Sequence, residues 1–347
     1  MKKKVIIAMS GGIDSSVAAA MLLDQNFDVV GTTFRLSESC DKTNVEDAKK
    51  ISSALGIKHI EFDISKEFQK KVVNYFISEY LSGRTPNPCV ICNKKIKFGI
   101  ALQKALDMKF EFFATGHYAK IFKKDNQYYV KKSEHKKDQS YYFCLLNQNQ
   151  LMHILTPVAN LTKSQVIKIA KEKKIASFIK KESQDICFIN GSYRKFMKMH
   201  TPDNFCNFLG YFVDENKKRI GRHEGIFNYT VGQRKGLNIS TGKRMYVKEI
   251  NVKDKSIMLS ENFKIESILV CNLNFLNKLN FPIRAFIQTR YNSDLNFGTI
   301  VLLNDDEVLI NFDLPIRFAS PGQFAVFYVE NILIGGGIIQ KIFFKNY

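Results

Sequence analysis

Several residue types and patterns are missing from this chain or scarce in it, and each absence narrows the kind of protein it can be. The 347 residues include no tryptophan and only seven prolines, and no apolar run reaches the length of about eighteen residues that a membrane-spanning helix needs. We therefore expect no membrane association. The basic start MKKKVIIAMSGG has a short apolar run that ends in Gly-Gly rather than in a cleavage site, so we interpret it as the first strand of a cytoplasmic protein.

The cysteines are too irregularly spaced to indicate a disulfide framework. In an intracellular chain of this length, clustered cysteines are more often catalytic or metal-binding. The seven positions are Cys40, Cys89, Cys92, Cys144, Cys187, Cys206 and Cys271.

Acidic residues are scarce relative to basic ones. Lys and Arg total 52 and Asp and Glu total 33, so the formal net charge is 52 − 33 = +19. A field of this sign favours a polyanionic partner such as RNA. A generally lysine-rich surface would have the same composition, so the charge alone does not decide between the two interpretations.

The N-terminal part of the chain shows an alternation of strand and helix patterns. Residues 4–34 read as strand, glycine loop, helix and strand, and the alternation continues through 44–81 and 110–119. This pattern predicts an α/β fold with a doubly wound, mostly parallel sheet whose ligand site lies at the carboxyl ends of the strands. From about residue 246, closely spaced short strands predict a small antiparallel barrel or sandwich. The length suggests two or three domains.

The string SGGIDSS at residues 10–16 joins the first strand to the first helix. Glycines allow close backbone approach, and a helix N-terminus offers N–H groups and positive dipole to phosphate. Asp14 suits a bridging cation such as Mg²⁺ between its carboxylate and pyrophosphate. The Walker A pattern is absent. A structural helix start would explain a Gly-Gly turn, but the full string resembles the PP-loop of N-type ATP pyrophosphatases, which adenylate a substrate and release pyrophosphate.

Further strings follow in order: GRTPNPCVICNKKIKFG, ATGHYAK, KDQSYYFCLL, SQDICFI, TVGQRKGL and SPGQFAVFY. Together with the loop they resemble the bacterial tRNA-specific 2-thiouridylases, the MnmA or TrmU family. The resemblance implies a PP-loop domain at 1–190, a small central tRNA-contacting domain at 191–265 and a C-terminal antiparallel β-barrel at 266–347. The implied activity is ATP-dependent replacement of O2 by sulfur at the wobble uridine of tRNA.

The resemblance also carries over binding residues and partners. Phe34 stands where the family often has methionine, and an aromatic ring there can stack on adenine. The implied partners are tRNA and a sulfur donor protein, either a cysteine desulfurase or a sulfur relay protein, and we expect a monomer. The implied ATP-binding residues are Ala8, Met9, Ser10, Gly11, Gly12, Ile13, Asp14, Ser15, Phe34 and Gly116. The implied target-base and tRNA-binding residues are Asn87, Pro88, Cys89, His117, Lys137, Asp138, Gln139, Arg290, Tyr291 and Gln323.

Thiolation chemistry of this kind needs two cysteines that meet in the fold. Esterification by AMP makes O2 a leaving group, a persulfide brings sulfur, and a second thiolate releases that sulfur by forming a disulfide with the carrier. By the resemblance, Cys187 carries the persulfide and Cys92 is the nucleophile that closes the Cys92–Cys187 disulfide. We interpret Cys144, Cys206 and Cys271 as buried small residues and Cys40 as incidental.

Cys89 departs from the family, which often has an aspartate acid or base at this position. A free thiol has a pKa near 8.5 and serves that role less well. The same residue opens an alternative in which Cys89, Cys92 and Cys187 ligate a [4Fe–4S] cluster. More remote alternatives are another PP-loop tRNA-modifying ligase and a non-catalytic RNA-binding homologue.

Overall fold

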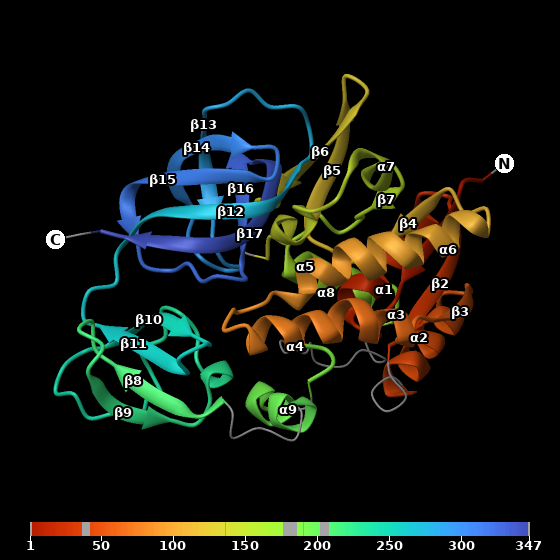
Figure 1. Ribbon diagram of the computed structural model, residues 1–347. Coiled ribbons are helices and arrows are strands. Elements are labelled where there is room, and N and C mark those ends of the chain that lie inside the picture. Colours follow the sequence, from red (N-terminus) through yellow and green to blue (C-terminus); the bar gives the residue numbers. More distant parts are fainter. Residues whose placement is uncertain are drawn as a thin grey trace. The chain divides into compact units, whose positions relative to one another are not determined.

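The computed structural model describes residues 2–36, 42–135, 137–175, 186–189, 191–201 and 208–345. The chain forms two compact units, and neither is one continuous stretch of sequence (Figure 1). The first unit comprises Met1–Val72, Cys89–Phe188 and Asn331–Ile334. The second unit comprises Val73–Pro88, Ile189–Glu330 and Gly335–Tyr347.

The first unit is built on a five-stranded parallel sheet with the strand order β3-β2-β1-β4-β7. Its centre, β1, is a short run of apolar residues with Val5, Ile6 and Ile7 fully buried, as expected for a strand covered on both faces. The chain runs outward from β1 in both directions, and such a reversal of strand order leaves a crevice at the carboxyl ends of the strands. The strands are β1 (Lys4–Ala8), β2 (Asp28–Arg35), β3 (Lys58–Asp63), β4 (Phe112–Ala114) and β7 (Ile154–Leu155).

Helices surround this sheet, and α1 (Ile13–Asp24) is buried most completely. Its residues from Ser15 to Ala20 are all buried, which is why its sequence is small and apolar nearly all round. The other helices are α2 (Lys42–Ala54), α3 (Ser65–Phe68), α5 (Pro88–Cys92), α6 (Leu102–Asp107), α7 (Gln148–Leu151) and α8 (Lys163–Glu172). Two segments are π-helical, η1 (Gln69–Val73) and η2 (Asn93–Ala101), and η3 (Ser140–Phe143) is a 3₁₀ turn.

Ion pairs join α1 to the first residue of α8, Lys163, and to the residue that caps its C-terminus, Lys173. Lys163 Nζ lies 2.8 Å from Asp14 Oδ1, and Lys173 Nζ lies 2.6 Å from Asp24 Oδ1. Because the N-terminal residues pair with each other and the C-terminal residues do the same, the two helices run in the same direction. Their N-termini therefore lie side by side.

A hairpin completes the first unit. Its strands are β5 (Ala119–Lys124) and β6 (Gln127–Lys132), which pair antiparallel. The first residues of β17, Ile332 and Leu333, pair with Lys131 and Val130 of β6.

The second unit contains a closed barrel with the strand order β12-β15-β14-β13-β16-β17, which the β12–β17 pairing closes. Alternate residues face its interior: Ile268 and Val270 of β12 and Val308 and Ile310 of β15 are fully buried. The strands are β12 (Ile265–Phe275), β13 (Ile283–Gln288), β14 (Asn296–Asn304), β15 (Glu307–Ile316), β16 (Phe324–Val329) and β17 (Ile332–Phe344).

A four-stranded sheet, with the order β10-β11-β8-β9, forms the rest of the second unit together with short helices. Tyr80 stacks on Tyr193 with ring centroids 5.3 Å apart, which ties α4 to α9. Because β10 and β11 pair within this sheet, the first two strands of the β-rich region are not part of the barrel. The elements are α4 (Asn74–Leu81), α9 (Tyr193–His200), η6 (Ile226–Asn228), β8 (Gly210–Val213), β9 (Arg219–His223), β10 (Tyr246–Asn251) and β11 (Ser256–Ser260).

The parallel sheet with its helices and the closed antiparallel barrel confirm the predicted fold class. The three domain boundaries expected from the sequence stay a prediction. Among the residues that the structure describes, no helix is both long enough and apolar enough to cross a membrane.

Candidate active site

The loop between β1 and α1 is supported by the neighbouring strands. Thr33 Oγ1 donates a hydrogen bond to the Met9 carbonyl (2.9 Å) and lies 2.9 Å from His59 Nε2. Gly11 has a φ of 73°, in the left-handed region that favours glycine. No side chain caps α1 at its N-cap residue Gly12. The N–H groups of the first helical turn can therefore bind a phosphate.

The loop serines stiffen the loop from within. Ser15 Oγ accepts from the Ser10 N–H (3.4 Å) and donates to the Gly12 carbonyl (3.1 Å). Ser16 Oγ donates to the same carbonyl at 2.9 Å. The hydroxyls of Ser15 and Ser16 are thus bound to the loop backbone, which fixes its curvature.

Asp14, the carboxylate of the loop, holds two partners from distant parts of the chain. Its Oδ1 accepts hydrogen bonds from the Tyr118 hydroxyl (2.5 Å) and from Lys163 Nζ (2.8 Å). The side chains of Lys163 and Asp14 are 29% and 21% exposed, so water screens this ion pair less than a surface pair. A lysine ammonium therefore stands at the loop beside its carboxylate.

Phe34 and Gly116 lie at the carboxyl ends of the two strands that flank β1. The Phe34 ring stacks between Phe62 and Phe113, with ring centroids 6.4 and 6.3 Å away. A Cβ at Gly116 would lie 2.6 Å from the Ser15 nitrogen, so only glycine allows this approach of the chain to α1. The structure thus brings the predicted ATP-binding residues to one edge of the sheet, at the ends of β1, β2 and β4.

The three cysteines of the predicted sulfur chemistry all belong to the first unit. Cys92 ends α5 and is 8% exposed, whereas Cys89 and Cys187 are exposed. Burial raises the pKa of Cys92 to about 12, the Lys97 ammonium lowers it, and charge on Cys187 or Cys89 raises it. These effects place Cys92 near both other thiols. No described cysteine is in a disulfide, so the Cys92–Cys187 bond stays a predicted reaction step.

Cys89 is a poor substitute for a carboxylate. Although it is exposed, the protein atoms around its thiol desolvate it and raise its pKa, and Lys97 offsets this only in part. At neutral pH the Cys89 side chain is therefore a neutral thiol. It can donate a weak hydrogen bond, but it offers no negative charge to a proton-transfer step.

The metal alternative finds no support in the side-chain arrangement. Within the ranges described above, no group of three His, Cys, Asp or Glu side chains could hold a metal ion. Cys89, Cys92 and Cys187 are all among these residues, and an iron–sulfur cluster on these three thiols stays an alternative. Cys144 is fully buried, as expected, and Cys271 is half-buried. Cys40 and Cys206 lie outside the described residues.

His117 lies among aromatic rings in the first unit. Its ring centroid is 5.9 Å from that of Phe98 and 5.4 Å from that of Phe143, and its Nδ1 is 2.8 Å from Thr115 Oγ1. Burial lowers the pKa of His117 well below its usual value, and the Lys97 charge lowers it further. The imidazole is therefore neutral at neutral pH. A contact with RNA would be a hydrogen bond and not an ion pair.

Lys137 and Gln139 hold Tyr118, the residue that binds Asp14. Lys137 Nζ lies 5.8 Å from the centroid of the Tyr118 ring, and the Tyr118 N–H donates to Gln139 Oε1 at 3.0 Å. Two residues predicted to contact tRNA thus also support a neighbour of the PP-loop carboxylate.

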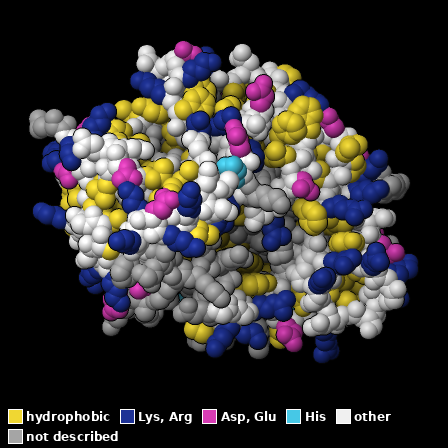
Figure 2. All heavy atoms as spheres, turned by 180° about the vertical axis from the view of Figure 1, so that it is seen from behind, with side chains coloured by type: hydrophobic (Ala, Val, Ile, Leu, Met, Phe, Trp, Pro, Cys, Tyr) yellow, Lys and Arg dark blue, Asp and Glu magenta, His cyan; other side chains and the backbone are white. Residues whose placement is uncertain are grey.

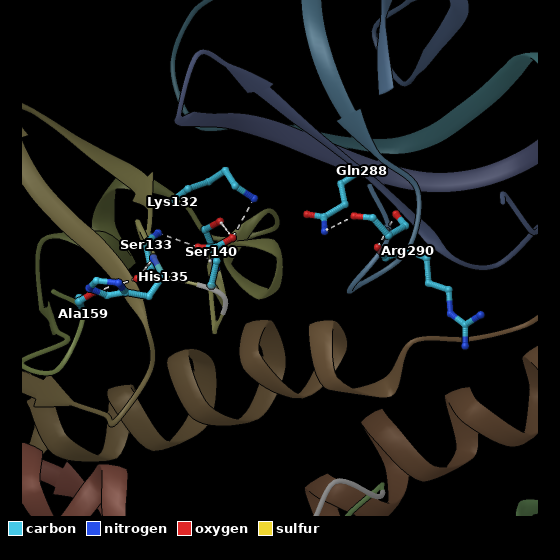
Figure 3. A network of polar contacts seen from close by, with 9 residues as sticks. Lys132, Ser133, His135, Ser140, Ala159, Gln288 and Arg290 are labelled. Atoms are coloured by element: carbon cyan, nitrogen blue, oxygen red, sulfur yellow. Dashed lines mark hydrogen bonds and ion pairs between the residues drawn. The ribbon is translucent and has the colours of Figure 1, made fainter. Parts of the chain in front are cut away.

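Asp138, between them, organises its own loop. Its carboxylate accepts hydrogen bonds from Lys132 Nζ (3.0 Å), the Ser133 N–H (2.8 Å) and Ser140 Oγ (2.8 Å). Figure 3 shows Lys132, Ser133 and Ser140 drawn together around this point. Because both carboxylate oxygens of Asp138 are engaged within this loop, its part in tRNA binding would be to shape the loop, and direct contact stays a prediction.

Gln323 supports the segment that precedes the target-base residues. Its Nε2 donates to the carbonyls of Thr85 (2.9 Å) and Pro86 (3.1 Å), and the residue is 8% exposed. All these residues belong to the second unit, as do Asn87 and Pro88. A tRNA contact by Gln323 stays a prediction, and the structure adds a supporting role.

Arg290 and Tyr291 lie in the turn that follows β13. The Ser293 N–H donates to the Arg290 carbonyl (3.0 Å), and Gln288 Nε2 donates to the Ser293 carbonyl (3.1 Å). Arg290 is exposed, and its guanidinium points away from Gln288 (Figure 3). An exposed guanidinium on a fixed turn suits a phosphate contact.

Basic side chains are spread over the surface. Figure 2 shows Lys and Arg across the whole visible face, with fewer Asp and Glu between them. The charge of +19 is therefore not confined to one patch on this face. Such a distribution attracts a polyanion over a broad area.

The parallel sheet, its switch in strand order and the glycine–serine loop define an α/β nucleotide-binding protein. Three family profiles match successive parts of the chain: the tRNA methyl transferase HUP domain at residues 3–191, the tRNA methyl transferase PRC-barrel domain at 194–261 and the aminomethyltransferase beta-barrel domain at 265–339. The tRNA-specific 2-thiouridylase MnmA of Acetivibrio thermocellus is 43% identical over 359 residues, which cover 98% of this chain and 99% of that protein.

The MnmA of Clostridioides difficile is 41% identical, with 98% of this chain and 99% of that protein covered. The chain therefore belongs to the MnmA family of tRNA-specific 2-thiouridylases, which confirms the resemblance seen in its motifs. The chain is also similar to a solved complex of a 4-thiouridine synthetase with RNA and bound ATP. The superposition covers 51% of this chain and 42% of the synthetase chain, at 19% identity and a TM-score of 0.34.

Sequence reasoning missed three residues of this site. Tyr118 and Lys163 contact Asp14, and Lys97 acts electrostatically on Cys89, Cys92 and His117. Tyr118 and Lys97 lie inside quoted strings but were not singled out. Lys163 lies in none of the quoted strings, and the residues around it carry no signal of a contact with Asp14.

Proposed function

We propose that this protein catalyses the ATP-dependent 2-thiolation of the wobble uridine in the tRNA anticodon. The observation that carries the proposal is an identity of about 40% along the whole chain with relatives named tRNA-specific 2-thiouridylase. The nucleotide loop and the thiols of the first unit supply chemistry of the required kind. We further propose that the enzyme works in the cytoplasm as a monomer.

The first step is adenylation of the uracil. Its O2 attacks the α-phosphorus of ATP, a P–O bond forms, and pyrophosphate leaves with the electron pair of the broken bond. The first-turn N–H groups of α1 bind the phosphates, and adenine lies beside Phe34, which is half-buried at the carboxyl end of β2. Asp14 is a single carboxylate, which fits Mg²⁺ because this ion takes its other ligands from phosphates and water. When bound, Mg²⁺ would neutralise phosphate charge.

The second step is sulfur transfer from a persulfide on Cys187. The terminal sulfur attacks C2 of the adenylated uracil, and AMP leaves with the electron pair of the C2–O bond. The Cys92 thiolate then attacks Sγ of Cys187, so that the Cys92–Cys187 bond forms and the persulfide S–S bond breaks. The electron pair stays on the sulfur at C2, which becomes the thiocarbonyl. A thiol reductant then restores both cysteines.

The persulfide itself must come from a partner, a cysteine desulfurase or a sulfur relay protein. Cys187 is exposed, which suits a residue that meets a donor protein. The anticodon loop is single-stranded, so little base pairing is lost when the wobble base enters the site. The basic surface favours the tRNA as partner.

The test is the 2-thiouridine content of tRNA, measured by mass spectrometry of nucleosides after depletion of the protein and complementation with variants. Cys187→Ser and Cys92→Ser should each abolish 2-thiouridine, because one removes the sulfur carrier and the other its release. The matched control is Cys144→Ser, a buried thiol outside this chemistry. Unchanged 2-thiouridine in the depleted strain would refute the proposed function.

A further inference from the structure

The helix that carries Cys92 changes its winding directly after that residue. α5 ends at Cys92, and the nine residues of η2 that follow, with Cys92 as their N-cap, are π-helical. π-helical segments are rare, are mostly single turns inside α-helices, and occur often at functional sites. A stretch of this length next to a candidate nucleophile therefore requires an explanation.

The winding decides which side chain follows Cys92 on the same face. In an α-helix, a residue five positions later lies about 140° round the axis. In a π-helix the hydrogen bonds run from i to i+5, so the fifth residue lies roughly one turn further along the same face. The fifth residue after Cys92 is Lys97.

The lysines of this segment separate accordingly. Lys97 is half-buried, and its positive charge lowers the pKa values of Cys92, Cys89 and His117. The charge of Lys94 instead lowers the pKa of the buried Cys144, and the Lys95 side chain is exposed. One lysine of the three thus faces the sulfur chemistry.

We propose that Lys97 is a positioning residue of the sulfur-transfer step, whose ammonium the π-helical turn holds beside Cys92 so that it stabilises the thiolate. This inference rests on the proposed function, because it assigns to Cys92 the attack on Sγ of Cys187. It explains how the Cys92 thiol can ionise although it is only 8% exposed. Position 89 holds a cysteine and not the aspartate that could take up the proton in many relatives, so another group must favour the thiolate.

Among the described residues, three charged or titratable groups affect the pKa of Cys92. They are Lys97 on its own helical segment, Cys89 one turn before it, and Cys187 from the segment 186–189. Among them only Lys97 lowers the pKa of Cys92, whereas burial, Cys187 and Cys89 raise it. His117, whose pKa the Lys97 charge also lowers, is neutral and therefore does not repel the ammonium.

The test measures how fast Cys92 reacts with methyl methanethiosulfonate, a small reagent for thiolates, across pH 7 to 10 in the full chain. Peptide fragmentation separates Cys92 from Cys89. Lys97→Met should slow the modification of Cys92 at pH 8 on the order of tenfold, since the loss of one charge shifts the ionisation by about one pH unit. Lys97→Arg should keep the wild-type profile.

The matched control is Lys95→Met, the same change two residues away on the exposed side of the same segment, and it should leave the profile unchanged. An unaltered profile in Lys97→Met, or an equal shift in Lys95→Met, would overturn the proposal. Lys97→Gln is the second neutral variant if methionine disturbs the fold. The reaction uses neither ATP nor tRNA, so its outcome is independent of whether the chain thiolates tRNA.

Discussion

At the scale of single residues, the protonation state of His117 follows from its packing. The ring lies against Phe98 and Phe143, and burial lowers its pKa well below the usual value. The unfolded chain binds a proton at this histidine below about pH 6.5, while the native one does not. The stabilisation due to neutral His117 is therefore present above that pH and is lost as the pH falls below it.

We predict that the free energy of unfolding decreases by about 1 kcal/mol per pH unit below pH 6.5 because of His117 alone. The slope should be smaller by this amount in His117→Gln, measured by urea unfolding at pH 5.5 and 6.5. His59 and His223 have lowered pKa values for the same reason, burial, so some slope remains in the variant. Nitrogen NMR of the native protein that shows a charged His117 at pH 6 would contradict the prediction.

At the scale of elements, the pair α1 and α8 offers a comparison of two lysines in similar settings. Lys163 and Lys173 each form an ion pair with an aspartate of α1, but only Asp14 belongs to the nucleotide loop. Removing either lysine should reduce stability by no more than about 1 kcal/mol, since both pairs are partly exposed. Their effects on nucleotide binding should differ.

We predict that Lys163→Met weakens ATP binding by about tenfold, because it removes a cation from the phosphate site. Lys173→Met should change the Kd less than about twofold. Titration calorimetry with Mg²⁺ and a non-hydrolysable ATP analogue measures both. Equal losses in the two variants would mean that Lys163 only joins the helices.

At the scale of the whole molecule, the net charge of +19 governs how the protein meets a polyanion. The tRNA affinity should fall by at least about 100-fold between 50 and 200 mM salt, because each phosphate contact releases counterions. Arg290→Gln should reduce the slope of log K against log salt by about one. Filter binding at four salt concentrations is sufficient, and a slope near zero would contradict a broad electrostatic contribution.

The sequence predicted the sheet and barrel well because their signals are local. The apolar run of β1 and the string SGGIDSS are each read within a few residues. Lys163 was missed because its contact with Asp14 joins residues 149 positions apart. Lys97 was missed because an expectation of ordinary α-helical winding places it away from Cys92, and nothing in the composition of the segment indicates a π-helix.

The two ion pairs between α1 and α8 fix how far one helix is shifted along the other. Both join residues 149 apart, and the spacing along each helix is the same, 24 − 14 = 10 and 173 − 163 = 10. An insertion between residues 25 and 162 increases the sequence separation of both pairs by the same number. The ten-residue spacing within each helix stays the same, so both ion pairs can still form. An insertion between 163 and 173 would break one pair and turn the residues beyond it by about 100°. The two ion pairs therefore fix the relative position of the helices along their length, whatever the number of residues between them.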